Sequence, residues 1–225
     1  MASIVDIARA LPDVEALRRH CIALAAFDII REPKNAWARE HSFDARWRPG
    51  LAAAVMEGSG DGYFIGFCDQ GALLIGFDHE SPMSPYSSDP MQTWPGILDD
   101  VPNGLSWILS EIPEFLDDDA VLATSCTWRT SSGLSWNTGS RLRFPSDHDN
   151  PDGAAVILDE LTQFEPGFHV LRLGLDSTSE VAAAVRGVLD LAGPVERFAA
   201  VLNPGCDVAS VTSELHSIGY PRPRD

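Results

Sequence analysis

The chain of 225 residues is 44% hydrophobic and 22% charged, which is typical of a globular protein and excludes wholesale disorder. Its 16 Lys and Arg residues are outnumbered by 33 Asp and Glu residues, which gives a net charge of −17. This balance argues against nucleic-acid binding, because affinity for phosphates depends on cationic side chains. It favours a basic protein as partner, although bacterial cytosolic proteins are also acidic for solubility alone.

The sequence shows no recognisable targeting signal, and its cysteine spacing is typical of a cytoplasmic protein. No run of about 18 uncharged apolar residues predicts a membrane span. The N-terminus, MASIVDIARALPD, has acids in place of the basic start of a signal peptide, so we expect a cytoplasmic protein. The cysteines are too widely spaced for a metal clip, and we interpret them as small apolar core residues, with disulfides or a thiol nucleophile as alternatives: Cys21, Cys68, Cys126 and Cys206.

The first third of the chain begins with helices. Residues 3–10 predict a short helix, and apolar residues at helical spacing predict a second over 13–30. Residues 34–49 lose this periodicity and mix arginines with aromatic residues. We interpret this segment as a loop that packs Trp37 and Trp47 onto the core while its arginines pair with acids.

Three apolar runs follow, at residues 51–56, 63–68 and 72–77. Short Gly-rich connectors separate them, as hairpin turns require, because a positive φ costs little only for glycine. We therefore predict an antiparallel three-stranded meander.

The middle of the chain predicts less regular structure. Residues 81–95 are rich in proline and predict an ordered loop. A short helix is expected within 103–116 and an acidic bend at 117–119. The β-branched run 121–128 predicts a strand, with a partner strand over 134–144.

The last third predicts mainly helices. Asn150-Pro151-Asp152 is typical of a helix start, and the helix is expected to run to residue 163. Residues 168–175 alternate as a strand does, with a helix as the alternative. Further helices are expected over 179–193, 195–202 and 207–219, the last capped by its first residue.

These elements predict an α+β fold, with a central antiparallel sheet flanked by N- and C-terminal helices. We expect residues 1–225 to form a single domain. The alternative is two subdomains joined near residues 146–152, because all six tryptophans lie between Trp37 and Trp136.

Asp78, His79 and Glu80 follow the third strand of the meander and form the first candidate site. If the extended geometry continues, Asp78 and Glu80 share one face and His79 takes the other. A metal ion would need a further ligand, such as Asp61, His41 or His148, and we predict neither a metal nor a cofactor. The structural alternative is a turn fixed by side-chain hydrogen bonds of Asp78 and Ser81.

A second candidate site is Trp128-Arg129 with Trp136, because an arginine next to exposed indoles can stack on a ligand or clamp a carboxylate. The alternative, which stays open, is that the strand tryptophans are core residues and the arginine forms a surface ion pair. The candidate binding surface comprises Asp61, Asp78, His79, Glu80, Ser81, Trp94, Trp128 and Arg129.

Over residues 50–140 the block order GSGD, GFDHES, TWR and Trp136 resembles a pattern found in uncharacterised bacterial proteins, and this resemblance implies no established activity. In its acidic character the chain is also similar to immunity proteins that neutralise bacterial toxins. We therefore expect a non-enzymatic binding protein, an immunity-like inhibitor of a basic partner. The alternative is a hydrolase or metal-dependent enzyme centred on Asp78, His79 and Glu80.

Overall fold

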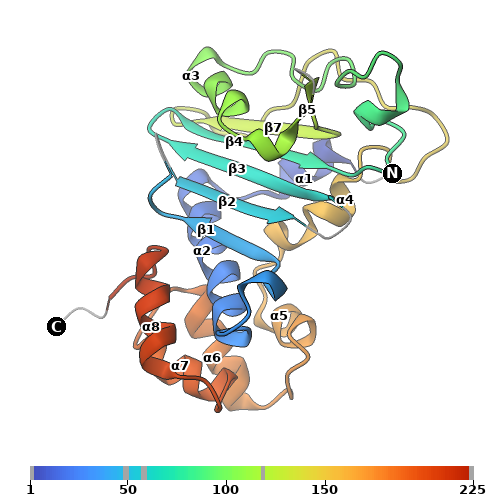
Figure 1. Ribbon diagram of the computed structural model, residues 1–225. Helices are drawn as coiled ribbons and strands as arrows, with labels where there is room; N and C mark the ends of the chain where they lie inside the picture. The colour runs from blue at the N-terminus through green and yellow to red at the C-terminus, as the bar shows by residue number, and fades with distance from the viewer. Residues whose placement is uncertain (1–2, 48–50, 57–59, 118–119, 223–225) are drawn as a thin grey trace. The chain divides into compact units, whose positions relative to one another are not determined.

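A computed structural model describes residues 3–47, 51–56, 60–117 and 120–222 (Figure 1). The chain contains both α-helices and antiparallel strands, which confirms the predicted α+β class. It divides into two compact units. Unit 1 consists of Met1–Val14 and Trp47–Thr162, and unit 2 consists of Glu15–Arg46 and Gln163–Asp225. The expectation of a single domain stays a prediction.

The sheet of unit 1 is built on the predicted meander. Strands β2 (Leu51–Met56), β3 (Gly62–Cys68) and β4 (Gly71–Phe77) pair in sequence order, each antiparallel to the next. The turn between β3 and β4 is Asp69-Gln70, and Gly71 after it has a φ of 136°. The meander was predicted correctly because short glycine-containing connectors leave antiparallel pairing as the available geometry.

The strand after the meander differs from the prediction. Strand β7 (Ser125–Thr130) pairs antiparallel with β4, while β5 (Leu116–Asp117) and β6 (Ala120–Val121) form a separate small ladder. Residues 118–119 of the predicted acidic bend lie outside the described residues. The predicted strand over 134–144 is absent from this described segment, where one isolated bridge joins Asn137 to Trp128. Ser, Asn and Gly residues in this segment favour turns over a ladder.

Both faces of the meander are covered within unit 1. Gly66 lies opposite Leu73 in the register, and Gly76 lies an odd number of residues further along β4, so the two glycines face opposite sides. A Cβ at Gly66 would be 2.9 Å from the Ile108 side chain, and one at Gly76 would be 3.5 Å from Leu158. Strands buried on both faces read as continuous apolar runs, which is the pattern of β3 and β4.

Short helices supply these covers. Ile108 belongs to a 3₁₀ turn, η3 (Trp107–Ser110), that continues α3 (Asn103–Ser106). Leu158 follows α4 (Ala154–Ile157), and α1 (Ile4–Ala10) packs beside α4. The remaining 3₁₀ turns are η1 (Ala36–Ala38), η2 (Pro85–Ser87), η4 (Pro113–Phe115) and η5 (Asp159–Thr162).

The predicted helix start at Asn150-Pro151-Asp152 is wrong. The helix α4 begins at Ala154 after Gly153, whose φ is 72°. Asp152 is fully buried, and its carboxylate accepts hydrogen bonds from the backbone N–H groups of Ile4 at 2.7 Å and of Ala154 at 3.1 Å. A long-range bond to α1 therefore takes the place of a simple cap.

Unit 2 is helical apart from β1 (His41–Asp44), a strand in the segment that we predicted as a loop. Helices α6 (Ser179–Leu189), α7 (Val195–Leu202) and α8 (Val208–Ser217) confirm the last three predicted helices. Successive helices of this series pack against each other, beginning with α5 (Pro166–Arg172). Helix α5 occupies the segment that we predicted as a strand, so that prediction is wrong and the helical alternative is correct.

The longest helix, α2 (Val14–Arg31), confirms the predicted second helix, but its later part is buried on every side, from His20 to Ile30. The expectation that Trp37 packs on the core is wrong, because its side chain is 99% exposed.

Among the described residues, no helix combines the length and the apolar character needed to cross a membrane.

Candidate functional site

The end of the β3–β4 ladder brings two predicted site residues together. Gly62 of β3 pairs with Phe77 of β4. Asp61 comes directly before β3 and Asp78 directly after β4, so both leave the ladder at the same end. The antiparallel register therefore joins residues 17 positions apart in the sequence.

Asp61 holds His79 by two hydrogen bonds to one carboxylate oxygen. The backbone N–H of His79 donates to Asp61 Oδ1 at 2.7 Å, and the ring Nδ1 lies 2.8 Å from the same atom. The imidazole is 41% exposed, whereas the Asp61 side chain is 14% exposed. The hydrogen bond to Asp61 raises the pKa of His79, and the negative charges of Asp61, Glu80 and Asp78 act in the same direction.

Residues 78–81 form a turn, which contradicts the expectation of continued extended geometry. Asp78 Oδ1 accepts a hydrogen bond from the Glu80 N–H at 2.9 Å, and the Ser81 N–H donates to the Asp78 carbonyl at 3.2 Å. Ser81 is buried, and its hydroxyl donates to the Pro151 carbonyl at 2.7 Å. The Met83 N–H also donates to Ser81 Oγ at 3.0 Å, and this bond and the one from Glu80 to Asp78 are side-chain hydrogen bonds of the turn-forming kind that the structural alternative predicted. We name Asp61, Asp78, His79 and Glu80 the acidic turn.

The other candidates do not join the acidic turn. Trp128 and Arg129 pair with Leu73 and Ala72 near the start of β4, on the order of 16 Å along the strand from its end. Trp128 is buried, so it does not belong to an exposed binding surface. Arg129 donates to the Gly133 carbonyl at 3.1 Å.

Trp94 is partly exposed, and its indole N–H donates to the Arg143 carbonyl at 2.9 Å. This bond fixes the ring to the distant segment that contains Arg143. The structure therefore brings together four of the eight predicted residues, buries Ser81 and Trp128, and leaves Trp94 and Arg129 in other surroundings.

Two groups of His and acidic side chains in the described ranges have metal-compatible spacing. One is Asp61, Asp78 and His79, whose ligand atoms lie within 4.8 Å of one another. Two carboxylates and an imidazole suit Zn²⁺ or Mn²⁺ by ligand type. His41 and His148, the other proposed completing ligands, are not in this group.

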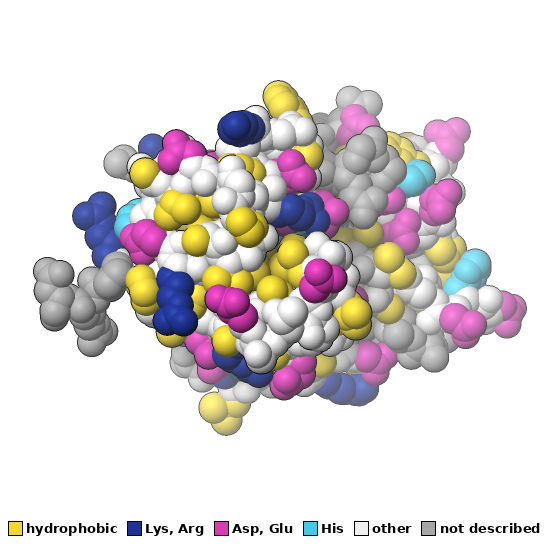
Figure 2. Space-filling model, turned by 90° about the horizontal axis from the view of Figure 1, so that it is seen from below, with side chains coloured by type: hydrophobic (Ala, Val, Ile, Leu, Met, Phe, Trp, Pro, Cys, Tyr) yellow, Lys and Arg dark blue, Asp and Glu magenta, His cyan; other side chains and the backbone are white. Residues whose placement is uncertain are grey.

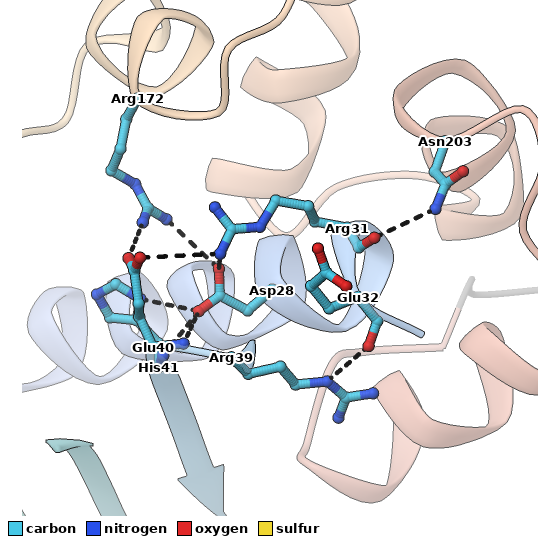
Figure 3. A network of polar contacts seen from close by, with 8 residues as sticks. All are labelled: Asp28, Arg31, Glu32, Arg39, Glu40, His41, Arg172 and Asn203. Carbon is cyan, nitrogen blue, oxygen red and sulfur yellow. Dashed lines mark hydrogen bonds and ion pairs between the residues drawn. The ribbon is translucent and has the colours of Figure 1, made fainter. Parts of the chain in front are cut away.

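The second group, Asp28, Glu40 and His41, belongs to unit 2 and was missed by sequence reasoning (Figure 3). Asp28 of α2 is fully buried. Its Oδ2 accepts hydrogen bonds from the N–H groups of Glu40 at 2.9 Å and His41 at 2.7 Å, and lies 3.1 Å from His41 Nδ1. The carboxylate thereby fixes the start of β1.

Arginines already neutralise this second group. Arg31 and Arg172 each have a guanidinium nitrogen within 4 Å of both Asp28 and Glu40, at 3.1–3.9 Å (Figure 3). Burial alone would raise the pKa of Asp28, but hydrogen bonds and charge from His41, with the charge of Arg172, hold that pKa below its usual value. Two cations beside two carboxylates leave no net attraction for a metal ion, so we interpret the group as a structural ion-pair network.

One signal in the sequence could have revealed this network. Asp28 interrupts the apolar run of residues 21–30, CIALAAFDII, and a charge at such a position is rarely buried without partners. The partners themselves, Arg172 above all, come from distant segments, and no spacing in the sequence indicates them.

The two units differ sharply in charge. Unit 1 contains 20 acidic and 5 basic residues, a net charge of −15, whereas unit 2 contains 13 and 11, a net charge of −2. Together they account for the −17 of the whole chain. The acidic turn belongs to unit 1, so it lies within the charged unit.

No family model, curated protein or solved structure matches this chain.

Proposed function

We propose that the chain is a non-enzymatic binding protein that uses unit 1 to bind a basic protein partner, as an immunity-like inhibitor does. The observation that carries the proposal is the concentration of charge, −15 of −17, in one compact unit. A unit with this excess of negative charge attracts an oppositely charged partner, raises the association rate and makes binding sensitive to salt.

The few cations of unit 1 do not offset this charge. Arg9 pairs with Asp6 at 3.2 Å, and Arg141 pairs with Asp99 at 2.6 Å, while Arg48 lies outside the described residues. Several exposed acids of unit 1 form no ion pair within the described part of the chain: Asp69, Asp89, Glu111, Glu114, Asp147 and Asp149. Their charge is available to a partner.

The experiment compares two triple variants of equal charge change as bait in pull-downs from the source cells, at about 50 and 500 mM salt. The unit 1 variant carries Asp69→Asn, Glu111→Gln and Glu114→Gln. We expect the parent to retain a basic protein at low salt only, and the unit 1 variant to retain several-fold less.

The matched control carries three unit 2 changes, Asp176→Asn, Asp190→Asn and Glu196→Gln, and is expected to bind as the parent does. Retention of no basic protein at low salt would overturn the proposal. Equal loss in both triple variants would show that total charge matters and that unit 1 does not provide the binding surface.

A second candidate is a metal-dependent enzyme at the acidic turn, favoured by the convergence of Asp61, Asp78 and His79. His79 Nε2 forms no hydrogen bond within the described residues, and the ring is open to solvent. Calorimetry with Zn²⁺ and Mn²⁺ tests this candidate. Binding lost in His79→Ala and kept in Glu80→Gln would support it, and no heat of binding to the parent would exclude it.

A further inference from the structure

Trp37 lies on the surface of unit 2 with its side chain 99% exposed. An indole offers about 150–250 Å² of surface for burial, and Trp is the residue most enriched at the energetic centres of protein interfaces. Lys34, also exposed, lies three residues before it and forms no ion pair among the described residues. The segment thus carries an exposed aromatic ring and an exposed positive charge three residues apart.

The segment that carries Trp37 is held firmly at both ends. The Asn35 N–H donates to the Glu32 carbonyl at 3.4 Å, and the Ala38 N–H donates to the Asn35 carbonyl at 3.1 Å. Arg39 donates to the Glu32 carbonyl at 3.0 Å and makes a two-pronged contact with the Glu214 carboxylate of α8. An anchored backbone loses little conformational entropy on binding, so the indole side chain of Trp37 is the main group left to be ordered by a contact.

A groove on the same unit has the complementary chemistry. It lies between α6 and α7, has a volume of about 390 Å³, and is lined by Ser179, Glu180, Ala183, Ala184, Arg197, Phe198 and Val201. This volume lies within the range of roughly 300–1,000 Å³ in which proteins bind small molecules, so an indole fits. Phe198 can contact an indole face to edge, Arg197 can lie over its ring, and Glu180 can pair with a neighbouring cation.

We propose that Trp37 of one copy of the chain docks into the α6–α7 groove of a second copy. The charge pattern favours this occupant: Lys34 accompanies the indole, and Glu180 lines the groove without an ion pair in the described residues. Unit 2 is also the unit with almost no net charge, so two copies associate through it without the repulsion that two −15 units would add.

The contact is between chains, because an indole that is 99% exposed does not occupy the groove of its own chain. Each copy carries one Trp37 and one groove, so a reciprocal exchange of both contacts would give a closed dimer with a twofold axis. One face of the molecule shows basic, acidic and hydrophobic side chains interspersed (Figure 2).

Sedimentation equilibrium of the full chain from about 5 µM to 1 mM, in 0.15 M salt, tests the proposal. A dimer is expected, and Trp37→Ala should raise its dissociation constant at least about 100-fold, tenfold for each of the two indoles. Leu134→Ala is the matched control, since Leu134 is 94% exposed in unit 1, and it should leave the constant unchanged. A parent that stays monomeric to 1 mM, or a dimer that survives Trp37→Ala, overturns the proposal.

A charge exchange tests the register of the contact. Lys34→Glu and Glu180→Lys should each weaken the dimer, and the double variant should restore it, because the pair forms again with its signs reversed. Two single effects that simply add in the double variant would contradict the Lys34–Glu180 pairing. This test does not depend on the identity of any basic partner.

Discussion

One carboxylate oxygen, Asp61 Oδ1, receives both the backbone N–H and the ring nitrogen Nδ1 of His79, at 2.7 and 2.8 Å. This double contact fixes the rotamer of the imidazole and places the proton on Nδ1, so that Nε2 is the atom available to solvent or to a ligand. The main chain and the side chain of His79 are thus positioned by one residue from the neighbouring strand.

The first prediction concerns the titration of His79. Asp61→Asn should lower the pKa of His79, because the hydrogen bond to the Asp61 carboxylate is the main cause of its raised value. Since the pKa is raised in the folded state, the stabilisation is fully present below about pH 6.5 and is lost as the pH rises through the folded pKa. NMR titration of the His79 ring measures the change. Asp69→Asn, which removes a distant acid of unit 1, is the control, and an equal shift in both variants would contradict the pairing.

The second prediction concerns acid denaturation and Asp28. Its pKa is lowered in the folded state, so its stabilisation is present above about pH 3.9 and is lost as the pH falls through the folded pKa. Asp28→Asn should lower the free energy of unfolding by about 3–5 kcal/mol near pH 7, because Arg31 and Arg172 lose their buried counter-charge. Urea denaturation at pH 7 and pH 3 measures both values.

The difference between the parent and Asp28→Asn should shrink at pH 3, because this pH lies below the ordinary Asp pKa of about 3.9 and the unfolded parent there takes up a proton at Asp28. Asp176→Asn, an exposed acid of the same unit, should change the free energy of unfolding by less than about 0.5 kcal/mol. A difference that is constant from pH 7 to pH 3 would indicate that the charge of Asp28 does not stabilise the network.

The third prediction concerns the buried hydrogen bonds of Asp152. Asp152→Ala leaves the N–H groups of Ile4 and Ala154 without their acceptor, which should cost about 2–4 kcal/mol in the free energy of unfolding. Asp149→Ala, at an exposed neighbouring position, should be close to neutral. Hydrogen exchange at the Ile4 amide gives a local measurement, and unchanged protection there in Asp152→Ala would rule out the bond.

The pKa of Asp152 is shifted in the opposite direction to that of Asp28, so ionisation of Asp152 lowers the stability of the fold. Burial raises the pKa of Asp152, so its contribution to stability is present below about pH 3.9 and is lost as the pH rises through the folded pKa. Asp152→Asn keeps one acceptor oxygen without the buried charge, and should therefore cost less than Asp152→Ala at pH 7.

Local chemistry explains which elements were predictable. The meander follows from apolar runs separated by short glycine-containing turns, and the α8 start follows from Asp207, whose side chain accepts hydrogen bonds from the N–H groups of Ala209 and Ser210. Both signals lie within a few residues of the structure that they predict. Asp61 was considered in advance only as one of three possible further metal ligands, and its hydrogen bonds to His79 were not predicted.

Long-range contacts explain the errors. Asp152 follows the pattern of a helix start, yet its carboxylate is used by Ile4, 148 positions away. Residues 134–144 alternate as a strand does, but β7 finds its partner in β4. The role of Asp28 depends on Arg172 of another helix, and Trp37 is exposed although its composition suggests a core residue. For Asp152, β7 and Asp28 the deciding partner lies in a distant segment.

The fourth prediction concerns the close approach beneath the acidic turn. Gly153 has a φ of 72°, and a Cβ there would lie 2.4 Å from Asp78 Cβ and 2.5 Å from Asp78 Oδ2. Gly60 has a φ of 91° with nothing within 4 Å of its Cβ position. An alanine at either position would therefore carry a similar backbone strain of about 1–2 kcal/mol. Only the alanine at position 153 would also clash with Asp78.

Gly153→Ala should accordingly lower the free energy of unfolding by about 1–3 kcal/mol more than Gly60→Ala does. It should also move Asp78 and so shift the NMR resonances of His79, because the two residues lie in one turn and their ligand atoms lie within 4.8 Å. Gly60→Ala lies next to Asp61 and controls for a general disturbance of the loop. Equal costs in the two variants would mean that Asp78 does not pack on Gly153, and the turn would then lack the support that positions its carboxylate.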